Sequence, residues 1–109
     1  MLARANRIVS GADFRRVIRQ GRKLSSREAV ISVIQTAQDS PVRFGVVTGK
    51  SVGNAVVRNR IRRRVRAAAR AIIDQRSCAG VEVVVRALPG SDVTSVESWR
   101  SALERACGQ

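Results

Sequence analysis

Residues 54–73 read NAVVRNRIRRRVRAAARAII, and this stretch decides the fold. Its apolar side chains recur at three- and four-residue spacing, which predicts a helix with one apolar stripe. The stripe is made by Val57, Ile61, Val65, Ala68, Ala69 and Ile72. Because Asn54 is a good N-cap residue, we expect the helix to run from about residue 55 to Arg76, with Gly80 closing the unit.

Three β-branched runs predict strands around this helix. The runs 29–35 and 42–48 are separated by a turn around residues 39–41 and indicate a hairpin with a longer loop. A further strand is expected over 81–87, where a turn at Pro89 ends it.

Two shorter helices are predicted near the ends of the chain. Ser10, with Asp13 as its capping-box partner, opens a helix over 11–20. Thr94 and Glu97 form a second capping box that opens the last helix. The buried face of that helix is expected to carry Val96, Trp99 and Leu103.

The expected order is a helix, two or more strands, the long helix, a strand and a helix, which is α-β-β-β-α-β-α when three strands precede the long helix. This order is typical of an α+β fold in which helices pack on a small mixed sheet. A chain of 109 residues has the size of one domain, so we expect a single RNA-binding domain over residues 1–109.

The charge balance indicates a polyanionic partner. The chain has 21 basic and 8 acidic residues, a net charge of +13, which is more than solubility alone favours. All the basic residues except Lys23 and Lys50 are arginines, which pair bidentately with phosphate. Since no aromatic, lipid-inserting face accompanies them, nucleic acid is favoured over a membrane surface.

The basic residues gather where acidic ones are missing. No Asp or Glu occurs between Asp39 and Asp74, yet seven arginines lie between positions 58 and 70. An ordinary solvated helix face alternates the signs of its charges, whereas these arginines repel one another until phosphates neutralise them. Before the helix, Lys50 and two glycines precede Asn54, and backbone N–H groups at the helix N-terminus could hold a phosphate there.

The remaining composition argues against a protein-catalysed reaction and against membrane insertion. The chain has no His and no Tyr, and its carboxylates are scattered, so no general base or metal cluster is evident. Cys78 and Cys107 predict neither a zinc site nor a disulfide framework and are expected to be inert packing residues. No membrane span or secretory signal is found, which predicts a cytoplasmic protein.

The segment 50–66 resembles the bacterial ribonuclease P protein component. The hallmark of that family is a lysine, a glycine, Asn-Ala-Val and Arg-Asn-Arg followed by further basic residues, and the segment matches it nearly position by position. The Asp13-Phe14 pair and the Val-Val-Val-Arg-Ala strand before Pro89 extend the resemblance over the whole chain.

The resemblance implies the accessory subunit of an endoribonuclease. Such a subunit is noncatalytic, binds a catalytic RNA with one protein per RNA, and helps it to remove the 5′ leader of precursor tRNA. Hydrolysis would then depend on Mg²⁺ held through the RNA. The family fold, which is ribosomal protein S5 domain 2-like, has a left-handed crossover between parallel strands, expected here over residues 48–81 although right-handed connections are the rule.

The resemblance also implies two binding surfaces and no catalytic or metal-binding residue in the protein. The surface for the catalytic RNA comprises Lys50, Asn54, Arg58, Asn59, Arg60, Arg62, Arg63 and Arg66. The surface for the leader is a cleft between the first helix and the sheet, to which Phe14, Ile18 and Ser32 correspond. Ile18 and Ser32 stand where the family often has aromatic residues.

Other classes of protein fit the composition less well. A ribosomal or other structural RNA-binding protein would have a similar size and charge, and only the specific motif distinguishes it from a ribonuclease P protein component. A DNA-compacting protein usually has wedges or arms for the minor groove. A stand-alone nuclease would need an acid-base constellation that the chain lacks.

Overall fold

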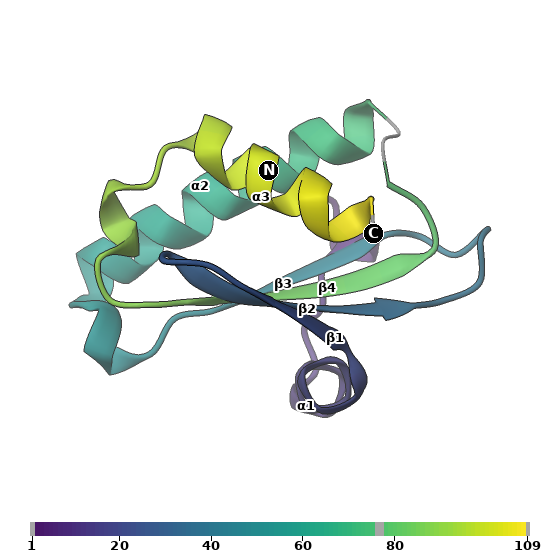
Figure 1. Ribbon diagram of the computed structural model, residues 1–109, viewed down its shortest axis with the longest axis horizontal. Coiled ribbons are helices and arrows are strands. Elements are labelled where there is room, and N and C mark those ends of the chain that lie inside the picture. The colour runs from purple at the N-terminus through teal and green to yellow at the C-terminus, as the bar shows by residue number, and fades with distance from the viewer. Residues whose placement is uncertain (1, 76–77, 109) are drawn as a thin grey trace.

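A computed structural model of the chain describes residues 2–75 and 78–108. One four-stranded sheet, in the order β1-β2-β4-β3, has helices on both faces (Figure 1). The elements are η1 (Arg4–Asn6), α1 (Gly11–Gln20), β1 (Arg22–Ser25), β2 (Ala29–Gln35), β3 (Arg43–Val47), η2 (Lys50–Val52), α2 (Ala55–Asp74), β4 (Val81–Ala87), η3 (Ser91–Val93) and α3 (Val96–Cys107). The predicted α+β class and order of elements are confirmed.

The pairing of the strands differs from the predicted hairpin. Strand β4 lies between β2 and β3, antiparallel to β2 and parallel to β3, while β2 forms its hairpin with β1. The hairpin between residues 29–35 and 42–48 is therefore wrong. The valine-rich β4 is almost wholly buried and takes a central position, whereas the polar strand β1 occupies an edge.

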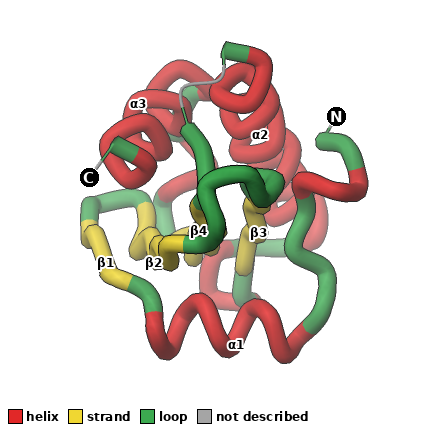
Figure 2. Tube along the Cα trace, turned by 90° about the vertical axis from the view of Figure 1, so that its right-hand side faces the viewer, coloured by secondary structure: helices red, strands yellow, loops and turns green. Residues whose placement is uncertain are grey.

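The connection from β3 through α2 to β4 is the crossover expected from the family. In Figure 2 both strands run away from the viewer, with β3 to the right of β4 and α2 above the sheet. The chain thus passes from the right-hand strand over the upper face to the strand on its left. This is a left-handed connection, against the general preference.

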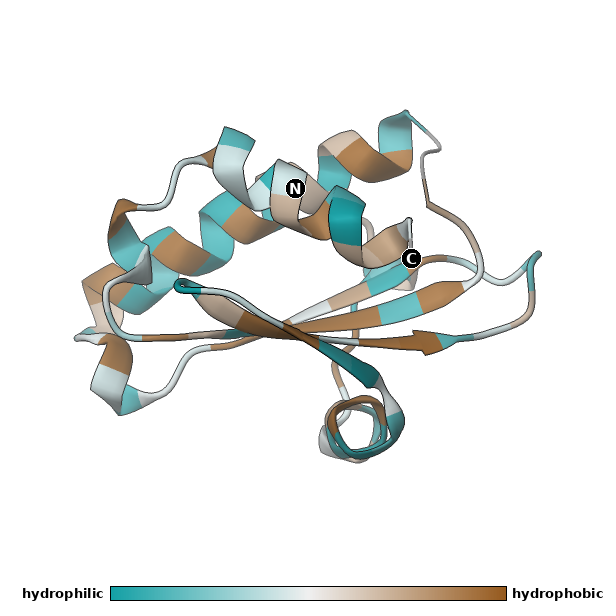
Figure 3. Ribbon diagram, in the orientation of Figure 1, coloured by the Kyte–Doolittle hydropathy of each residue, from teal (hydrophilic) through white to brown (hydrophobic). Residues whose placement is uncertain are grey.

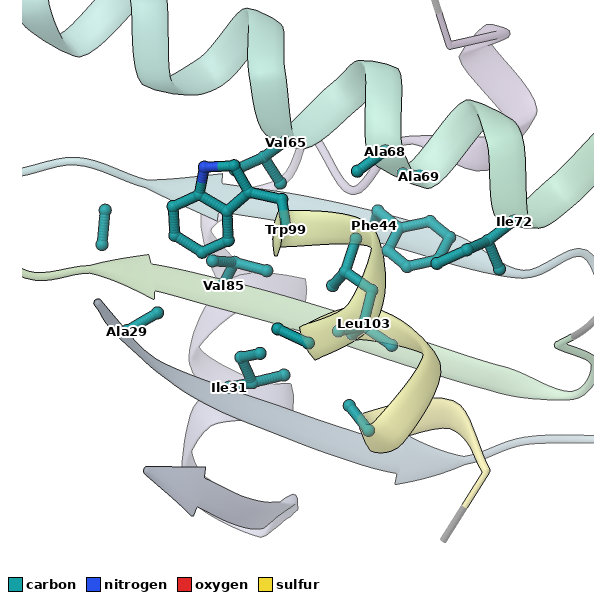
Figure 4. Close-up of a cluster of buried hydrophobic side chains, with 14 of the residues drawn as sticks. Ala29, Ile31, Phe44, Val65, Ala68, Ala69, Ile72, Val85, Trp99 and Leu103 are labelled. Atoms are coloured by element: carbon teal, nitrogen blue, oxygen red, sulfur yellow. The ribbon is translucent and has the colours of Figure 1, made fainter. Parts of the chain in front are cut away.

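The main core lies between the sheet and the helices α2 and α3. Figure 4 shows Trp99 and Leu103 of α3 packed between α2 and the strands. Both side chains are fully buried, as are Ile61, Val65 and Ile72 of the predicted stripe. Each such side chain contributes about 1.5 to 3 kcal/mol by leaving water. Figure 3 shows hydrophobic and hydrophilic bands alternating along α2, as expected for a helix with one apolar stripe.

The helix boundaries agree with prediction at most ends. Ser10 Oγ accepts a hydrogen bond from Asp13 N at the start of α1, and α2 begins after Asn54 as predicted. The predicted end of α2 at Arg76 lies outside the described residues. The start of α3 was misplaced by one residue, because Ser95 Oγ, not Thr94, accepts from Ser98 N. Val96 is consequently 38% exposed and not part of the buried face.

The two cysteines form a disulfide, in contrast to the expectation from the sequence. Cys78 precedes β4 and Cys107 ends α3; the two residues are 29 positions apart in the sequence, and their Cα atoms are 5.6 Å apart. The expectation of two inert thiols is therefore wrong. The two cysteines come together because α3 runs back over the sheet antiparallel to β4. Their spacing in the sequence does not predict this pairing.

Candidate nucleic-acid interface

Helix α2 presents its arginines on a rigid support. Its apolar stripe is fully buried at five positions, so the helix cannot turn about its axis without exposing the core. The charged side chains occupy the remaining arc of the helix. None of the ion pairs between described residues involves the predicted RNA-facing cations Arg58, Arg60, Arg62, Arg63 and Arg66.

The outer side of α2 is hollowed between basic side chains. One hollow is lined by Val56, Asn59, Arg62, Arg63 and Arg66. Arg62 Nη1 donates a hydrogen bond to Asn59 Oδ1 at 3.1 Å, which holds one guanidinium against the helix. Three predicted cations and the predicted amide therefore meet in one place, where they can surround a phosphate.

A second hollow joins α2 to the start of α3. It is lined by Arg60, Arg63, Arg64 and Val96, and Arg63 thus lies between the two hollows. Arg64 Nη1 donates to Asp92 O at 2.6 Å and to Thr94 O at 3.1 Å, so this arginine anchors the η3 loop. The side chain of Arg60 forms no hydrogen bond or ion pair with another described residue and is available to a ligand.

The N-terminus of α2 combines a cap with a tight turn. Asn54 Oδ1 accepts a hydrogen bond from Val57 N at 3.0 Å, so the amide predicted to face RNA also caps the helix. Gly53 has φ 153°, and a Cβ atom there would lie 2.8 Å from Val57 Cγ1. Only glycine suits this position. Lys50, in η2, is exposed just before the turn.

Arg58 occupies the flank of α2. Its side chain is partly buried, and its Nε atom is enclosed without a hydrogen-bond partner among the described residues. We refer to Arg58 and the arginines that line the two hollows as the basic side of α2.

The opposite face of the sheet carries the residues predicted to contact the leader. Phe14 and Ile18 are half-buried and pack on a small cluster made by Ile8, Val17 and Val84. The Phe14 ring lies over Gly45, because a Cβ atom at that glycine would come within 2.5 Å of Phe14 Cε1. Both side chains therefore serve packing while keeping some exposed surface.

Ser32 does not share that exposure. It lies in the central strand β2, opposite Val84 of β4, and is only 3% exposed. The Ser32 side chain therefore offers almost no surface to a ligand in this arrangement. Of the three residues predicted for the leader cleft, the structure leaves Phe14 and Ile18 accessible, and their contact with RNA stays a prediction.

Helix α1 is fixed over the sheet by alternating charges that the sequence analysis missed. Arg43 of β3 pairs with Asp13 of α1 at 2.9 Å and with Glu82 of β4 at 3.1 Å. Arg16 of α1 contacts the same two carboxylates. The hydrogen bond from Arg43 holds the pKa of Asp13 below its ordinary value, while the Glu82 carboxylate raises the pKa of Arg16.

Neither a metal centre nor a membrane span is found in the part of the chain that the structure describes. No three side chains of His, Cys, Asp or Glu lie close enough together within residues 2–75 and 78–108 to hold a metal ion. No helix over the same residues has the length and apolar character needed to cross a bilayer.

Comparisons with known proteins agree on one family. The family model described as ribonuclease P matches residues 2–109. The ribonuclease P protein component of Clavibacter michiganensis subsp. michiganensis is 42% identical, over 97% of this chain and 96% of its own length. That of Arthrobacter sp. (strain FB24) is 40% identical, over 95% of this chain and 79% of its own.

Solved structures show the same fold. The Staphylococcus aureus RNase P protein superposes with a TM-score of 0.73 at 25% identity, covering 94% of this chain and 92% of its own. The Thermotoga maritima RNase P protein gives a TM-score of 0.76 at 22% identity, covering 93% of this chain and 94% of its own, a likeness of fold alone.

Proposed function

The chain belongs to the ribonuclease P protein family, and from this premise we propose that it is the noncatalytic subunit of that ribonucleoprotein. In this role it binds a catalytic RNA and the 5′ leader of precursor tRNA, and assists endonucleolytic removal of the leader. One protein binds one RNA, in the cytoplasm, without a membrane or DNA partner.

The observation that carries the proposal is the unneutralised basic side of α2. This helix is held by a stripe that is fully buried at five positions. The described residues offer no acidic partner to the predicted RNA-facing arginines, which are Arg58, Arg60, Arg62, Arg63 and Arg66. Such a rigid cationic surface suits the phosphates of a folded RNA. Because each neutralised phosphate releases counterions, binding should weaken steeply with salt.

We assign the hydrolysis to the RNA because the described carboxylates form no catalytic cluster: no three of them lie close enough together to hold a metal ion, and several are ion-paired. Asp13 and Glu82 are held by Arg43 and Arg16, while Glu97 pairs with Arg100. None of these carboxylates is free to activate water or to join a metal cluster. Mg²⁺ would therefore be held through the RNA of the complex.

Leader binding is proposed on the face that carries α1. There Phe14 and Ile18 keep exposed surface next to the sheet, and a single-stranded RNA can stack a base on an accessible aromatic ring. With one aromatic residue on this face of α1, leader binding should be weak and tolerant of sequence.

Reconstitution with single omissions tests the proposal. Pure protein, catalytic RNA and precursor tRNA are mixed with Mg²⁺, and cleavage is measured with each component left out. We expect none from the protein without the RNA, and faster cleavage at low salt when the protein joins the RNA. Cleavage by the protein alone that a Glu82→Gln substitution abolishes would overturn the assignment. Tight RNA binding without any effect on cleavage would favour a structural RNA-binding protein instead.

A further inference from the structure

Arg86 is an exposed arginine in a central strand of the sheet. Along β4, Val83 and Val85 point into the core under α2 and α3, so Glu82, Val84 and Arg86 point to the face that carries α1. On that face Glu82 forms ion pairs with Arg16 and Arg43. The side chain of Arg86 has neither a hydrogen bond nor an ion pair with any residue in the described part of the chain, and it is open to solvent.

The neighbours of Arg86 form a smooth apolar floor. In the register of the sheet it stands beside Val30 of β2 on one side and Val47 of β3 on the other. Both valines are half-buried. Neither an acidic residue nor a side-chain acceptor stands beside Arg86 in this row, so the guanidinium has no role within the sheet itself.

This part of the sheet face is also uncovered. Figure 1 shows α1 end-on beneath the sheet, and the strands continue to the left of it with no helix directly beneath them until the one-turn helix η2. The row of Val30, Arg86 and Val47 lies four residues along β4 from Glu82, where α1 is attached. A single-stranded RNA that contacts the exposed part of Phe14 can therefore continue along the uncovered sheet face and reach Arg86.

We propose that Arg86 binds a backbone phosphate of the single-stranded leader and is a further substrate-binding residue of this chain. The inference rests on the proposed function and extends it to a residue outside α1. A phosphate contact is favoured over recognition of a base, because the two flanking valines supply no second polar group to orient one. A guanidinium between aliphatic side chains can pair bidentately with a phosphate from any nucleotide.

The test measures the affinity of the reconstituted complex for precursor tRNA and for mature tRNA at several salt concentrations. We expect Arg86→Gln to narrow the ratio of the two affinities about tenfold and to lower the salt slope for precursor tRNA by about one contact. Arg86→Lys should keep most of the ratio, since it keeps the charge. Because Arg86 is exposed, neither change should alter the melting temperature or the affinity for the catalytic RNA.

Arg105→Gln is the matched control, because Arg105 is an exposed arginine of α3, which packs on the opposite face of the sheet. It should leave the ratio unchanged. Precursor tRNAs with leaders of two unrelated sequences should lose the same affinity for the complex when Arg86 is replaced by Gln. A loss of affinity confined to one leader would overturn the phosphate contact. If wild type prefers precursor tRNA and Arg86→Gln keeps that preference, Arg86 is not a leader contact although leader binding stands. A wild-type complex without any preference overturns both.

A direct readout uses the free full-length protein. The Nε–Hε resonance of Arg86 should shift when a single-stranded RNA of about eight nucleotides is added. Polyglutamate of the same charge should shift it much less. An equal shift with polyglutamate would indicate an acidic-peptide surface and overturn the assignment to RNA.

Discussion

Arg43 Nη2 lies 2.9 Å from Asp13 Oδ2, and this contact ties the start of β3 to the first turn of α1. The same guanidinium reaches Glu82 of β4 through Nε at 3.1 Å. The contact thus sets how α1 lies on the sheet. Since Phe14 follows Asp13 and packs on Gly45, it also sets how much of the Phe14 ring stays exposed.

Stability should decrease in acid through Asp13. Its folded-state pKa is lowered, first by the hydrogen bond from Arg43, so the contribution is fully present above the unfolded pKa of about 4 and is lost as pH falls through the lower folded value. Asp13→Asn removes this titration. The difference in melting temperature between pH 7 and pH 3 should be smaller for the variant than for wild type. Equal differences would show that the contact adds nothing to stability.

The Cys78–Cys107 disulfide should stabilise the fold. It closes a loop between residues 29 positions apart, and bridges of this kind typically contribute about 2 to 4 kcal/mol. Dithiothreitol should lower the free energy of unfolding by that amount, measured by urea denaturation. Cys78→Ala/Cys107→Ala should unfold at the same lower urea concentration with or without reductant. Equal midpoints for oxidised and reduced wild type would contradict the stabilisation.

Arg60 and Arg64 should separate RNA binding from folding, although they lie in one hollow of α2. Arg60→Ala removes a side chain without a described partner, so the melting temperature should hold while binding to the catalytic RNA loses about 1.5 to 3 kcal/mol. Arg64→Ala breaks two hydrogen bonds to the η3 loop and should cost about 1 to 2 kcal/mol of folding stability. A collapsed melting temperature with unchanged affinity for Arg60→Ala would make Arg60 structural.

Gly53 should be sensitive to substitution and Gly49 tolerant, although both precede α2. Gly53→Ala forces a side chain into φ 153° and against Val57, so we expect a loss of about 1 to 3 kcal/mol of stability. At Gly49, φ is −84° and the nearest atom to an added Cβ is 4.0 Å away. Gly49→Ala should therefore be nearly neutral. Melting temperatures of the two variants test this prediction. If both substitutions lower the melting temperature equally, the strained turn at Gly53 is not the cause of the loss.

Elements with strong local signals could be predicted from the sequence. The caps at Ser10 and Asn54 and the apolar stripe of α2 act within a few residues, and the structure has them where expected. The order of the strands could not be predicted, because it depends on which apolar strand takes the centre of the sheet. The disulfide depends in the same way on the return of α3, which no local pattern encodes.

The candidate sites divide along the same line. The charge excess and the Asn-Ala-Val motif indicate α2 as the RNA-binding helix. They do not distinguish Arg64, whose side chain donates hydrogen bonds to the η3 loop, from Arg60, whose side chain has no partner among the described residues. The sequence does not indicate Arg86 as a binding residue, because a polar residue near the end of a predicted strand is common. Only the register, which sets it between Val30 and Val47 on an uncovered face, gives it significance.

The leader surface can be tested at Phe14 and Ile18. Phe14 packs on Gly45 but stays partly exposed, so we expect a base of the leader to stack on its ring, a contact that contributes about 1 to 3 kcal/mol. Phe14→Leu should narrow the ratio of affinities for precursor and mature tRNA while leaving affinity for the catalytic RNA unchanged. Ile18→Phe, which adds an aromatic ring to the same half-buried cluster, should widen that ratio.

Folding must be separated from recognition in this experiment, because Phe14 also packs under the sheet. A Phe-to-Leu change at a half-buried site should cost less than about 1.5 kcal/mol of stability, so both variants should remain folded at 25 °C. Melting temperatures are recorded alongside affinities at one salt concentration. If both variants are folded and keep the wild-type ratio, the leader does not use this side of α1. The basic side of α2 would then stand as the RNA-binding surface without it.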